Sequence, residues 1–305
     1  MTEFTGQSAG YSLYGITAGP DGNLWFTEYD GNTTAWKIGR ITTAGAITEF
    51  ANSGDAQGTP RGIVAGPDGN LWFVEAFNGE IGRITTSGSF TMFAIPTSSS
   101  NPQDIAAGAD GNLWFTESAS SKIGRITTSG TVTEFTLPGA SSAPYGIAAG
   151  PDGNIWFTEA AGGNKNKIGR MTTAGTLAEF SIPTANSIAE GITAGPDGNV
   201  WFTEASGSKI GRITPSGTIT EFSVPTVNSD PYNITAGPDG NVWFTESAAN
   251  TTSTSRIGRV TPDGTVTEVV VPTNGAAPWD ITTGPDGSLW FTEYFTNKIG
   301  RYTLP

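Results

Sequence analysis

One ten-residue motif occurs seven times along the chain and constrains its fold more than any other feature. The first copy, at 19–28, reads Gly-Pro-Asp-Gly-Asn-Leu-Trp-Phe-Thr-Glu, and its tryptophan returns after 47, 42, 42, 45, 42 and 47 residues. The seven tryptophans are Trp25, Trp72, Trp114, Trp156, Trp201, Trp243 and Trp290. A period of this size, with room for four short strands, is typical of propeller blades. The sequence therefore predicts an all-β, seven-bladed β-propeller.

Each period divides into four strand-like segments joined by turns. In the first period we expect an inner strand at 14–18, a second at 24–28, a third at 37–41 and an outer one at 46–50. The sequence Pro20-Asp21-Gly22 predicts a tight turn, because proline fixes φ, aspartate binds its own backbone and glycine adopts positive φ. No segment has a sustained 3.6-residue apolar period, so we predict essentially no helix.

The two ends of the chain predict how the ring closes. The last period begins at Trp279 and stops after its third strand, so its outer strand is missing. The N-terminal sequence Thr2-Glu3-Phe4 matches the outer strand Thr48-Glu49-Phe50. We predict that residues 2–4 complete the blade formed by 279–303, which removes an open sheet edge. Residues 1–305 would then form a single propeller domain.

The composition excludes several kinds of chemistry. Histidine and cysteine are both absent, which rules out disulfides, thiolate metal sites, a histidine base and a cysteine nucleophile. The net charge of −13 argues against binding to nucleic-acid phosphates. No apolar run of about 18 residues is present, so no transmembrane helix is expected. The compartment stays open between the cytoplasm and secretion followed by removal of a signal.

Two charged residues recur once in every period. The first is the glutamate that ends Trp-Phe-x-Glu, at Glu28, Glu75, Glu117, Glu159, Glu204, Glu246 and Glu293. The second is the arginine of Ile-Gly-Arg, at Arg40, Arg83, Arg125, Arg170, Arg212, Arg259 and Arg301. We expect an ion pair between the two in each blade. We also expect the tryptophans in the core, with the glycine before each arginine, such as Gly124, making room for the indole.

Residues outside the repeat gather on one face of the ring. The Pro-Asp-Gly and Thr-x-x-Gly turns share one face and hardly vary, so the variable loops lie on the other, where binding is usually found. Just before the inner-strand glycine or its equivalent, the blades carry Tyr14, Arg61, Gln103, Tyr145, Glu190, Tyr232 and Trp279. We predict an aromatic, acidic rim around a central depression that binds a small molecule, peptide or glycan. The predicted ligand-binding residues are Tyr14, Tyr145, Tyr232, Trp279, Tyr294 and Glu190, and an ordinary solvated propeller mouth is the alternative.

The repeat as a whole resembles that of the virginiamycin B lyase family. The likeness rests on Gly-Pro-Asp-Gly-Asn-Leu-Trp-Phe-Thr-Glu, Lys-Ile-Gly-Arg-Ile and Ile-Thr-Glu-Phe, and it extends over all seven periods. The resemblance implies a monomeric propeller whose active members open a cyclic depsipeptide by a magnesium-assisted elimination across an ester C–O bond. It also implies a general-base histidine after a proline at the start of the last inner strand.

The chain departs from that pattern where the resemblance places the chemistry. In Pro278-Trp279-Asp280 a tryptophan stands in the position of the histidine, and Ala277 replaces an acidic residue. A second family histidine corresponds to Tyr232, whereas the family glutamate survives as Glu293. Indole has no accessible basic lone pair, so we do not expect elimination by the family mechanism.

Three functions stay open from the sequence. The first is a non-catalytic binding or scaffold propeller. The second is a carboxylate-dependent C–O lyase acting on a cyclic depsipeptide such as a streptogramin B, with Glu293 and Asp280 as candidate catalytic residues. Magnesium would then be held by Glu293 and Glu246. The third is an engineered repeat protein with no natural ligand. None of these hypotheses includes a nucleic-acid or membrane partner.

Overall fold

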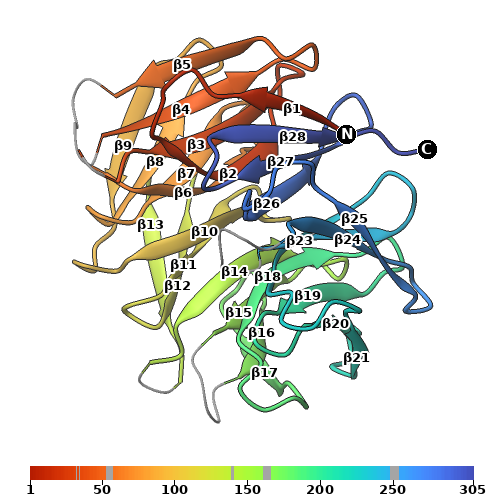
Figure 1. Cartoon of the computed structure of the whole chain (residues 1–305). Coiled ribbons are helices and arrows are strands. Elements are labelled where there is room, and N and C mark those ends of the chain that lie inside the picture. Colours follow the sequence, from red (N-terminus) through yellow and green to blue (C-terminus); the bar gives the residue numbers. More distant parts are fainter. Residues whose placement is uncertain (32, 34, 53–57, 139–140, 161–165, 248–253) are drawn as a thin grey trace.

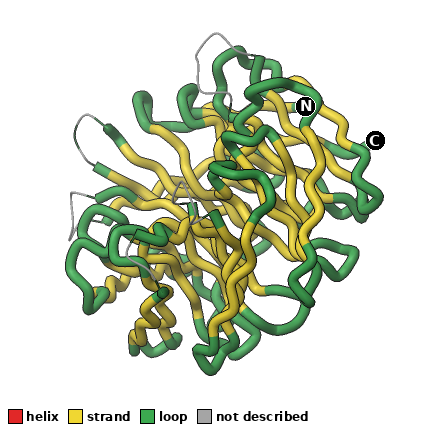
Figure 2. Tube along the Cα trace, turned by 90° about the horizontal axis from the view of Figure 1, so that it is seen from below, coloured by secondary structure: helices red, strands yellow, loops and turns green. Residues whose placement is uncertain are grey.

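Seven four-stranded antiparallel sheets follow one another around a common axis (Figure 1). The computed structural model describes residues 1–31, 33, 35–52, 58–138, 141–160, 166–247 and 254–305. Strands and loops account for all of this part, which contains no helix that could span a membrane (Figure 2). The predicted all-β, seven-bladed propeller is therefore confirmed.

In six blades the strands run from the axis outward in chain order, whereas the outer strand of the seventh blade is β1. The first four blades are β2 (Ser12–Ala18), β3 (Leu24–Tyr29), β4 (Trp36–Ile41), β5 (Ile47–Ala51); β6 (Pro60–Ala65), β7 (Leu71–Glu75), β8 (Glu80–Ile84), β9 (Phe90–Ala94); β10 (Pro102–Ala107), β11 (Leu113–Glu117), β12 (Lys122–Ile126), β13 (Val132–Thr136); and β14 (Pro144–Ala149), β15 (Ile155–Glu159), β16 (Lys167–Met171), β17 (Leu177–Ser181). The other three are β18 (Ala189–Ala194), β19 (Val200–Glu204), β20 (Lys209–Ile213), β21 (Ile219–Ser223); β22 (Pro231–Ala236), β23 (Val242–Glu246), β24 (Arg256–Val260), β25 (Val266–Val270); and β26 (Pro278–Thr283), β27 (Leu289–Glu293), β28 (Lys298–Tyr302), β1 (Thr2–Thr5).

The ring closes as the sequence predicted. β1 pairs antiparallel with β28, and Phe4 lies opposite Ile299. Strands from the two ends of the chain therefore share one sheet, as Figure 1 shows beside the N label. The first blade has longer strands than we expected, because Tyr29 pairs with both Ser12 and Trp36 and extends its ladder by one rung.

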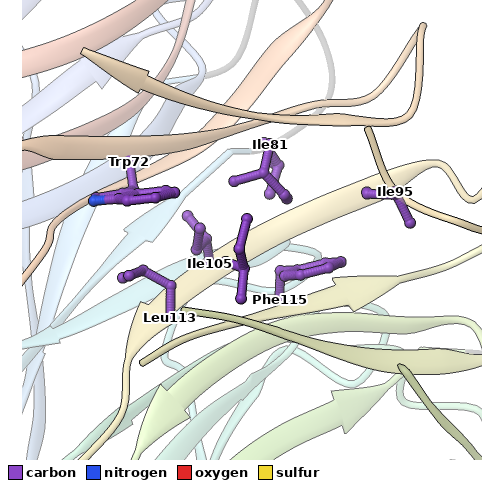
Figure 3. Packing of buried hydrophobic residues seen from close by; sticks show 8 residues of the cluster. Trp72, Ile81, Ile95, Ile105, Leu113 and Phe115 are labelled. Carbon is purple, nitrogen blue, oxygen red and sulfur yellow. The ribbon is translucent and has the colours of Figure 1, made fainter. Parts of the chain in front are cut away.

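The repeated tryptophans form the core between neighbouring blades. Trp72 is fully buried and packs with Ile81 of its own blade and with Ile105 and Leu113 of the next (Figure 3). Its indole N–H donates a 3.0 Å hydrogen bond to Asp68, the aspartate of the tight turn. The tryptophan side chain therefore links the tight turn of its motif to the core between the blades. The prediction that the repeated tryptophans are core residues is confirmed.

The repeated glycines make room for phenylalanine, so the expectation that they make room for the indole is wrong. A β-carbon on Gly124 would lie 2.0 Å from the ζ-carbon of Phe115, its partner in the antiparallel register. Trp114 instead packs against Gly108, where a β-carbon would lie 2.7 Å from the indole. The register explains the error, because Trp114 lies opposite Arg125, one residue beyond the glycine.

The expected ion pair between the recurring glutamate and arginine is also wrong. In the first blade Arg40 lies opposite Trp25, while Glu28 lies opposite Lys37. Arg40 stacks over the Trp25 ring at 5.5 Å, and its Nη1 lies 3.6 Å from a carboxylate oxygen of Asp21. Three residues of an antiparallel ladder separate the arginine from the glutamate, which is too far for a direct pair.

Candidate functional site

The seven inner strands meet around an axial pocket on the variable face of the ring. Its lining includes the residue before the inner-strand glycine or its equivalent in six blades, namely Arg61, Gln103, Tyr145, Glu190, Tyr232 and Trp279. The pocket encloses a cavity of about 40 Å³ and opens to solvent at its mouth. The structure thus brings four of the predicted ligand-binding residues, Tyr145, Glu190, Tyr232 and Trp279, into one pocket.

A local irregularity in each inner strand presents these side chains to the axis. In β22, for example, the pairing with β23 shifts between Pro231 and Ile234, so Tyr232 and Asn233 lie in a bulge. Such bulges re-aim side chains at the rim of closed sheets. The same shift occurs in the other inner strands, so the fold displays one variable residue per blade at the pocket.

The threonine of Trp-Phe-Thr-Glu holds each bulge in place and links it to the next blade. In the fourth blade the Thr158 hydroxyl accepts a 2.9 Å hydrogen bond from Gly146 N–H and donates a 2.8 Å bond to the carbonyl of Glu190. Six blades have this threonine, whereas the second has Val74. The sequence analysis did not predict this role, although a hydroxyl that recurs directly after two aromatic core positions was a signal for it.

Trp279 lies at the centre of an aromatic cluster beside the pocket. Its ring centroid is 4.0 Å from that of Tyr232 and 5.0 Å from that of Tyr294, which it stacks on at an interplanar angle of 28°. Tyr14 meets the edge of the indole at 5.4 Å and is itself buried, 7% exposed. Tyr14 and Tyr294 therefore pack against the indole without lining the pocket, whereas Trp279 and Tyr232 belong to the lining.

The pocket lining also contains polar groups. Arg61 donates a 2.7 Å hydrogen bond to the side-chain oxygen of Gln103. The phenol groups of Tyr145 and Tyr232 are hydrogen-bonded to each other, and Glu190 is hydrogen-bonded to Tyr232. Burial, followed by the nearby charge of Asp230, raises the pKa of Glu190 to about 8.

Three polar side chains line the base of the axial pocket. Asp104, Asn233 and Asp280 occupy positions that are glycine in the other blades, and they also line a second cavity that opens on the far side. Asp280 accepts 2.8 Å hydrogen bonds from the backbone N–H groups of Ile16 and Ile281. Burial raises the pKa of Asp280 to about 7. This candidate catalytic carboxyl thus lines the pocket while it also ties the last blade to the first.

The other candidate carboxyl groups lie outside the pocket lining. Glu293 and Glu246 end β27 and β23, and burial raises their pKa values to about 7 and about 8. The Glu293 carboxylate accepts a 2.7 Å hydrogen bond from Thr296, and Glu3 and Lys298 are the charges that act on it. The charges that act on Glu246 are those of Glu268 and Arg256.

These carboxyl groups do not assemble a magnesium site. Mg²⁺ favours octahedral oxygen ligands that converge on one point. Within the described part of the chain, no three aspartate, glutamate, histidine or cysteine side chains come together to hold a metal ion. Asp280, the only one of the three candidates in the pocket lining, already binds backbone N–H groups through both oxygens. The described carboxyl groups therefore do not fit a bound magnesium ion.

The protein is therefore a seven-bladed β-propeller with a pocket at its axis and an aromatic cluster on its variable face. The model of the virginiamycin B lyase family matches residues 1–166 and 163–305, so the chain belongs to the virginiamycin B lyase family. No curated protein sequence gives a significant match.

Three solved structures are similar to the chain over its whole length. Selenomethionine-substituted virginiamycin B lyase from Staphylococcus aureus is 38% identical, with a TM-score of 0.90, and the alignment covers 100% of this chain and 99% of that one. A streptogramin B lyase structure is also 38% identical, with a TM-score of 0.90 and coverage of 100% and 97%. The third, 39% identical with a TM-score of 0.90 and coverage of 100% and 99%, is a catalytically inactive S. aureus variant with one histidine replaced by alanine, together with quinupristin.

Proposed function

We propose that this chain is a binding propeller, which holds an organic ligand in its axial pocket and lacks the histidine-dependent chemistry of its relatives. The observation that carries the proposal is the position of Trp279. The family resemblance assigns a general base to this position, and here it is an indole in contact with Tyr232 and Tyr294. An indole cannot accept a proton near neutral pH, but it offers a flat apolar surface.

A relative supports the separation of binding from catalysis. The S. aureus variant whose histidine is replaced by alanine is catalytically inactive, yet it was obtained with quinupristin. Loss of the histidine is therefore compatible with ligand binding on this scaffold. The present chain contains no histidine at all. Its ligand is a small molecule, peptide or glycan with a planar or apolar face that packs against the indole.

Ligand arrays test the proposal directly. We expect aromatic small molecules, peptides or glycans that bind the chain to lose at least about tenfold in affinity in Trp279→Ala, because the stacking surface is removed. Trp279→Phe should retain part of the binding. Phe77→Ala removes an exposed aromatic ring outside the axial pocket and serves as the matched control. Equal binding by the parent and Trp279→Ala would overturn the proposal.

A second candidate function is a carboxylate-dependent C–O lyase acting on a cyclic depsipeptide. It is favoured by Asp280, a pocket carboxyl whose pKa of about 7 is suited to a general base. Both of its oxygens already accept backbone hydrogen bonds, so this candidate ranks second. Incubation with a streptogramin B, followed by mass analysis for a linear product that Asp280→Asn abolishes, would establish it in place of the binding function.

A further inference from the structure

A basic and an acidic side chain line the axial pocket without forming an ion pair with each other. Arg61 comes from β6 in the second blade and Glu190 from β18 in the fifth, three blades apart around the ring. The charge that acts most on Glu190 is that of Asp230, and Arg61 is not among the groups that shift its pKa. The two therefore face the pocket as separate sites.

Each of the two groups has a buried atom with no hydrogen-bond partner. Oε2 of Glu190 and Nε of Arg61 are both inaccessible to solvent, and neither is hydrogen-bonded within the described structure. Arg61 uses Nη1 for its bond to Gln103, and Glu190 is hydrogen-bonded to Tyr232. Leaving polar atoms of this kind unpaired is costly. Because both atoms are closed off from the pocket, a ligand has to contact the guanidinium and the carboxyl group through their other polar atoms.

The lining between the two charges is aromatic. Tyr145, Tyr232 and Trp279 belong to the same pocket, and the Trp279 ring lies 4.0 Å from that of Tyr232. A neutral ligand such as a glycan could pack against these rings but would leave the Arg61 guanidinium without a countercharge and the Glu190 carboxyl without an ionic partner. A ligand with a single charge would match one of them only. The observations fit best a ligand that carries both signs.

We propose that the axial pocket binds a zwitterion, an aromatic amino acid or short peptide with free termini, whose carboxylate pairs with Arg61 and whose ammonium group pairs with Glu190. This inference rests on the proposed binding function and specifies its ligand class. Guanidinium groups bind carboxylates through two parallel hydrogen bonds, and a carboxylate at the other side accepts from the ammonium group. The aromatic side chain of the ligand packs against Trp279 and Tyr232.

Proton release on binding follows from the same arrangement. With a pKa of about 8, Glu190 is mostly protonated at pH 7 when the pocket is empty. An ammonium group beside it favours the ionised form, so binding expels a proton. The titratable groups that interact with Glu190 are Asp230, Tyr232 and Tyr145, and Arg61 is the basic group elsewhere in the same pocket. Burial raises the pKa of both tyrosines, which therefore stay neutral and do not release this proton.

Calorimetry with four forms of one dipeptide tests the proposal. The probes are alanyl-phenylalanine with both termini free, its N-acetyl form, its C-terminal amide and the doubly blocked form. We expect each block to weaken binding by about tenfold, since each removes one charge-assisted pair between the ligand and the pocket. Glu190→Gln should abolish only the preference for the free amine. Arg61→Gln should abolish only the preference for the free carboxylate. At pH 7 the heat should depend on the ionisation enthalpy of the buffer in the parent and not in Glu190→Gln.

The outcomes distinguish failure of the zwitterion proposal from failure of the proposed binding function on which it rests. Equal affinity for all four forms, reduced in Trp279→Ala, would overturn the zwitterion and leave the aromatic binding site intact. Binding of aromatic ligands in the arrays but of none of the four dipeptides would do the same. If Glu190→Gln and Arg61→Gln both lost the same preference, the pocket would have collapsed. That outcome would overturn the assignment of separate partners to the two side chains. Thermal melting of both variants checks that the ring remains folded.

Discussion

The hydroxyl of Thr245 in the sixth blade donates a hydrogen bond of 3.0 Å to the carbonyl of Trp279 in the seventh. The same hydroxyl accepts a bond of 3.0 Å from Asn233 N–H in its own blade. One side chain therefore fixes the bulge that carries Tyr232 and the backbone beneath the central indole of the pocket. The position of the pocket side chains depends on these links between blades as much as on the strands themselves.

Thr245→Val should weaken both stability and ligand binding. The substitution keeps the shape of the side chain but leaves the Asn233 N–H and the Trp279 carbonyl without this partner. We expect a loss of about 1–3 kcal/mol in the free energy of unfolding, as for other buried groups left unpaired. Urea unfolding measures it, and Thr245→Ser, which keeps the hydroxyl, is the control. A valine variant as stable as the parent would show that the hydroxyl contributes nothing.

Val74→Thr should stabilise the protein. The second blade is the only one in the sequence without this threonine, and Val74 is fully buried in the corresponding place. By analogy with the other blades, a hydroxyl there would lie between the N–H of Gly62 and the carbonyl of Gln103. Because both of its hydrogen-bonding roles would be satisfied, we expect a gain of about 1 kcal/mol. A lower unfolding midpoint in urea would contradict the analogy.

Gly124→Val should destabilise the third blade strongly. A β-carbon at this position would lie 2.0 Å from the Phe115 ring, so the ring or the strand has to move. Overpacking of a fully buried site costs about 1–3 kcal/mol, and the branched side chain adds to it. Phe115→Leu combined with Gly124→Val should recover part of the loss, because the smaller side chain frees the space. The four variants of this double-mutant cycle, compared by thermal melting, would show no coupling if the contact were unimportant.

The repeat allowed the sequence to predict the fold in detail. Seven tryptophans at a nearly constant period predicted the number of blades, and the match of Thr2-Glu3-Phe4 to an outer strand predicted the closure. The pocket lining could be predicted for the same reason: a variable residue at one fixed place in every period has to meet its equivalents at the axis. Tyr232 and Trp279 were found in this way.

The wrong predictions concerned side-chain contacts that depend on which residues pair across the strands. Opposite charges at recurring positions predicted an ion pair of Glu28 with Arg40, but the register places Lys37 opposite Glu28. Similarly, a recurring glycine indicates a close approach without identifying the group that approaches. Contacts between blades, such as that of Thr245 with Trp279, involve residues 34 positions apart and leave only a recurring hydroxyl in the sequence.

The buried glutamates at the ends of the second strands should make the protein less stable as the pH rises from 5 to 8. Burial raises the pKa of Glu28 to about 8 and that of Glu117 to about 7, and both oxygens of Glu28 are buried without a hydrogen bond. Groups whose folded pKa exceeds the unfolded value of 4.5 bind more protons in the native state. The free energy of unfolding therefore falls as the pH rises above 4.5 and levels off once the folded pKa values are passed.

The outer-strand glutamates act in the opposite direction and set the lower limit of the stable range. Burial alone would raise the pKa of Glu49, but its hydrogen bonds with Lys37 and Ser8 lower it overall. The contribution of Glu49 to the free energy of unfolding is lost as the pH falls below about 4.5. The two sets together place maximum stability near pH 5, and we expect the Tm to fall by at least about 5 °C between pH 5 and pH 8.

Thermal melting of two variants attributes this pH dependence to the buried carboxyl groups. Glu28→Gln should reduce the slope of Tm between pH 5 and pH 8, because a neutral amide replaces one of the groups that must ionise. Asp263→Asn is the matched control, since it alters an exposed carboxyl and should leave that slope unchanged. A parent Tm that rises over this range would mean that the second-strand carboxyl groups are ionised in the folded protein, because only a folded pKa below the unfolded value gives that sign.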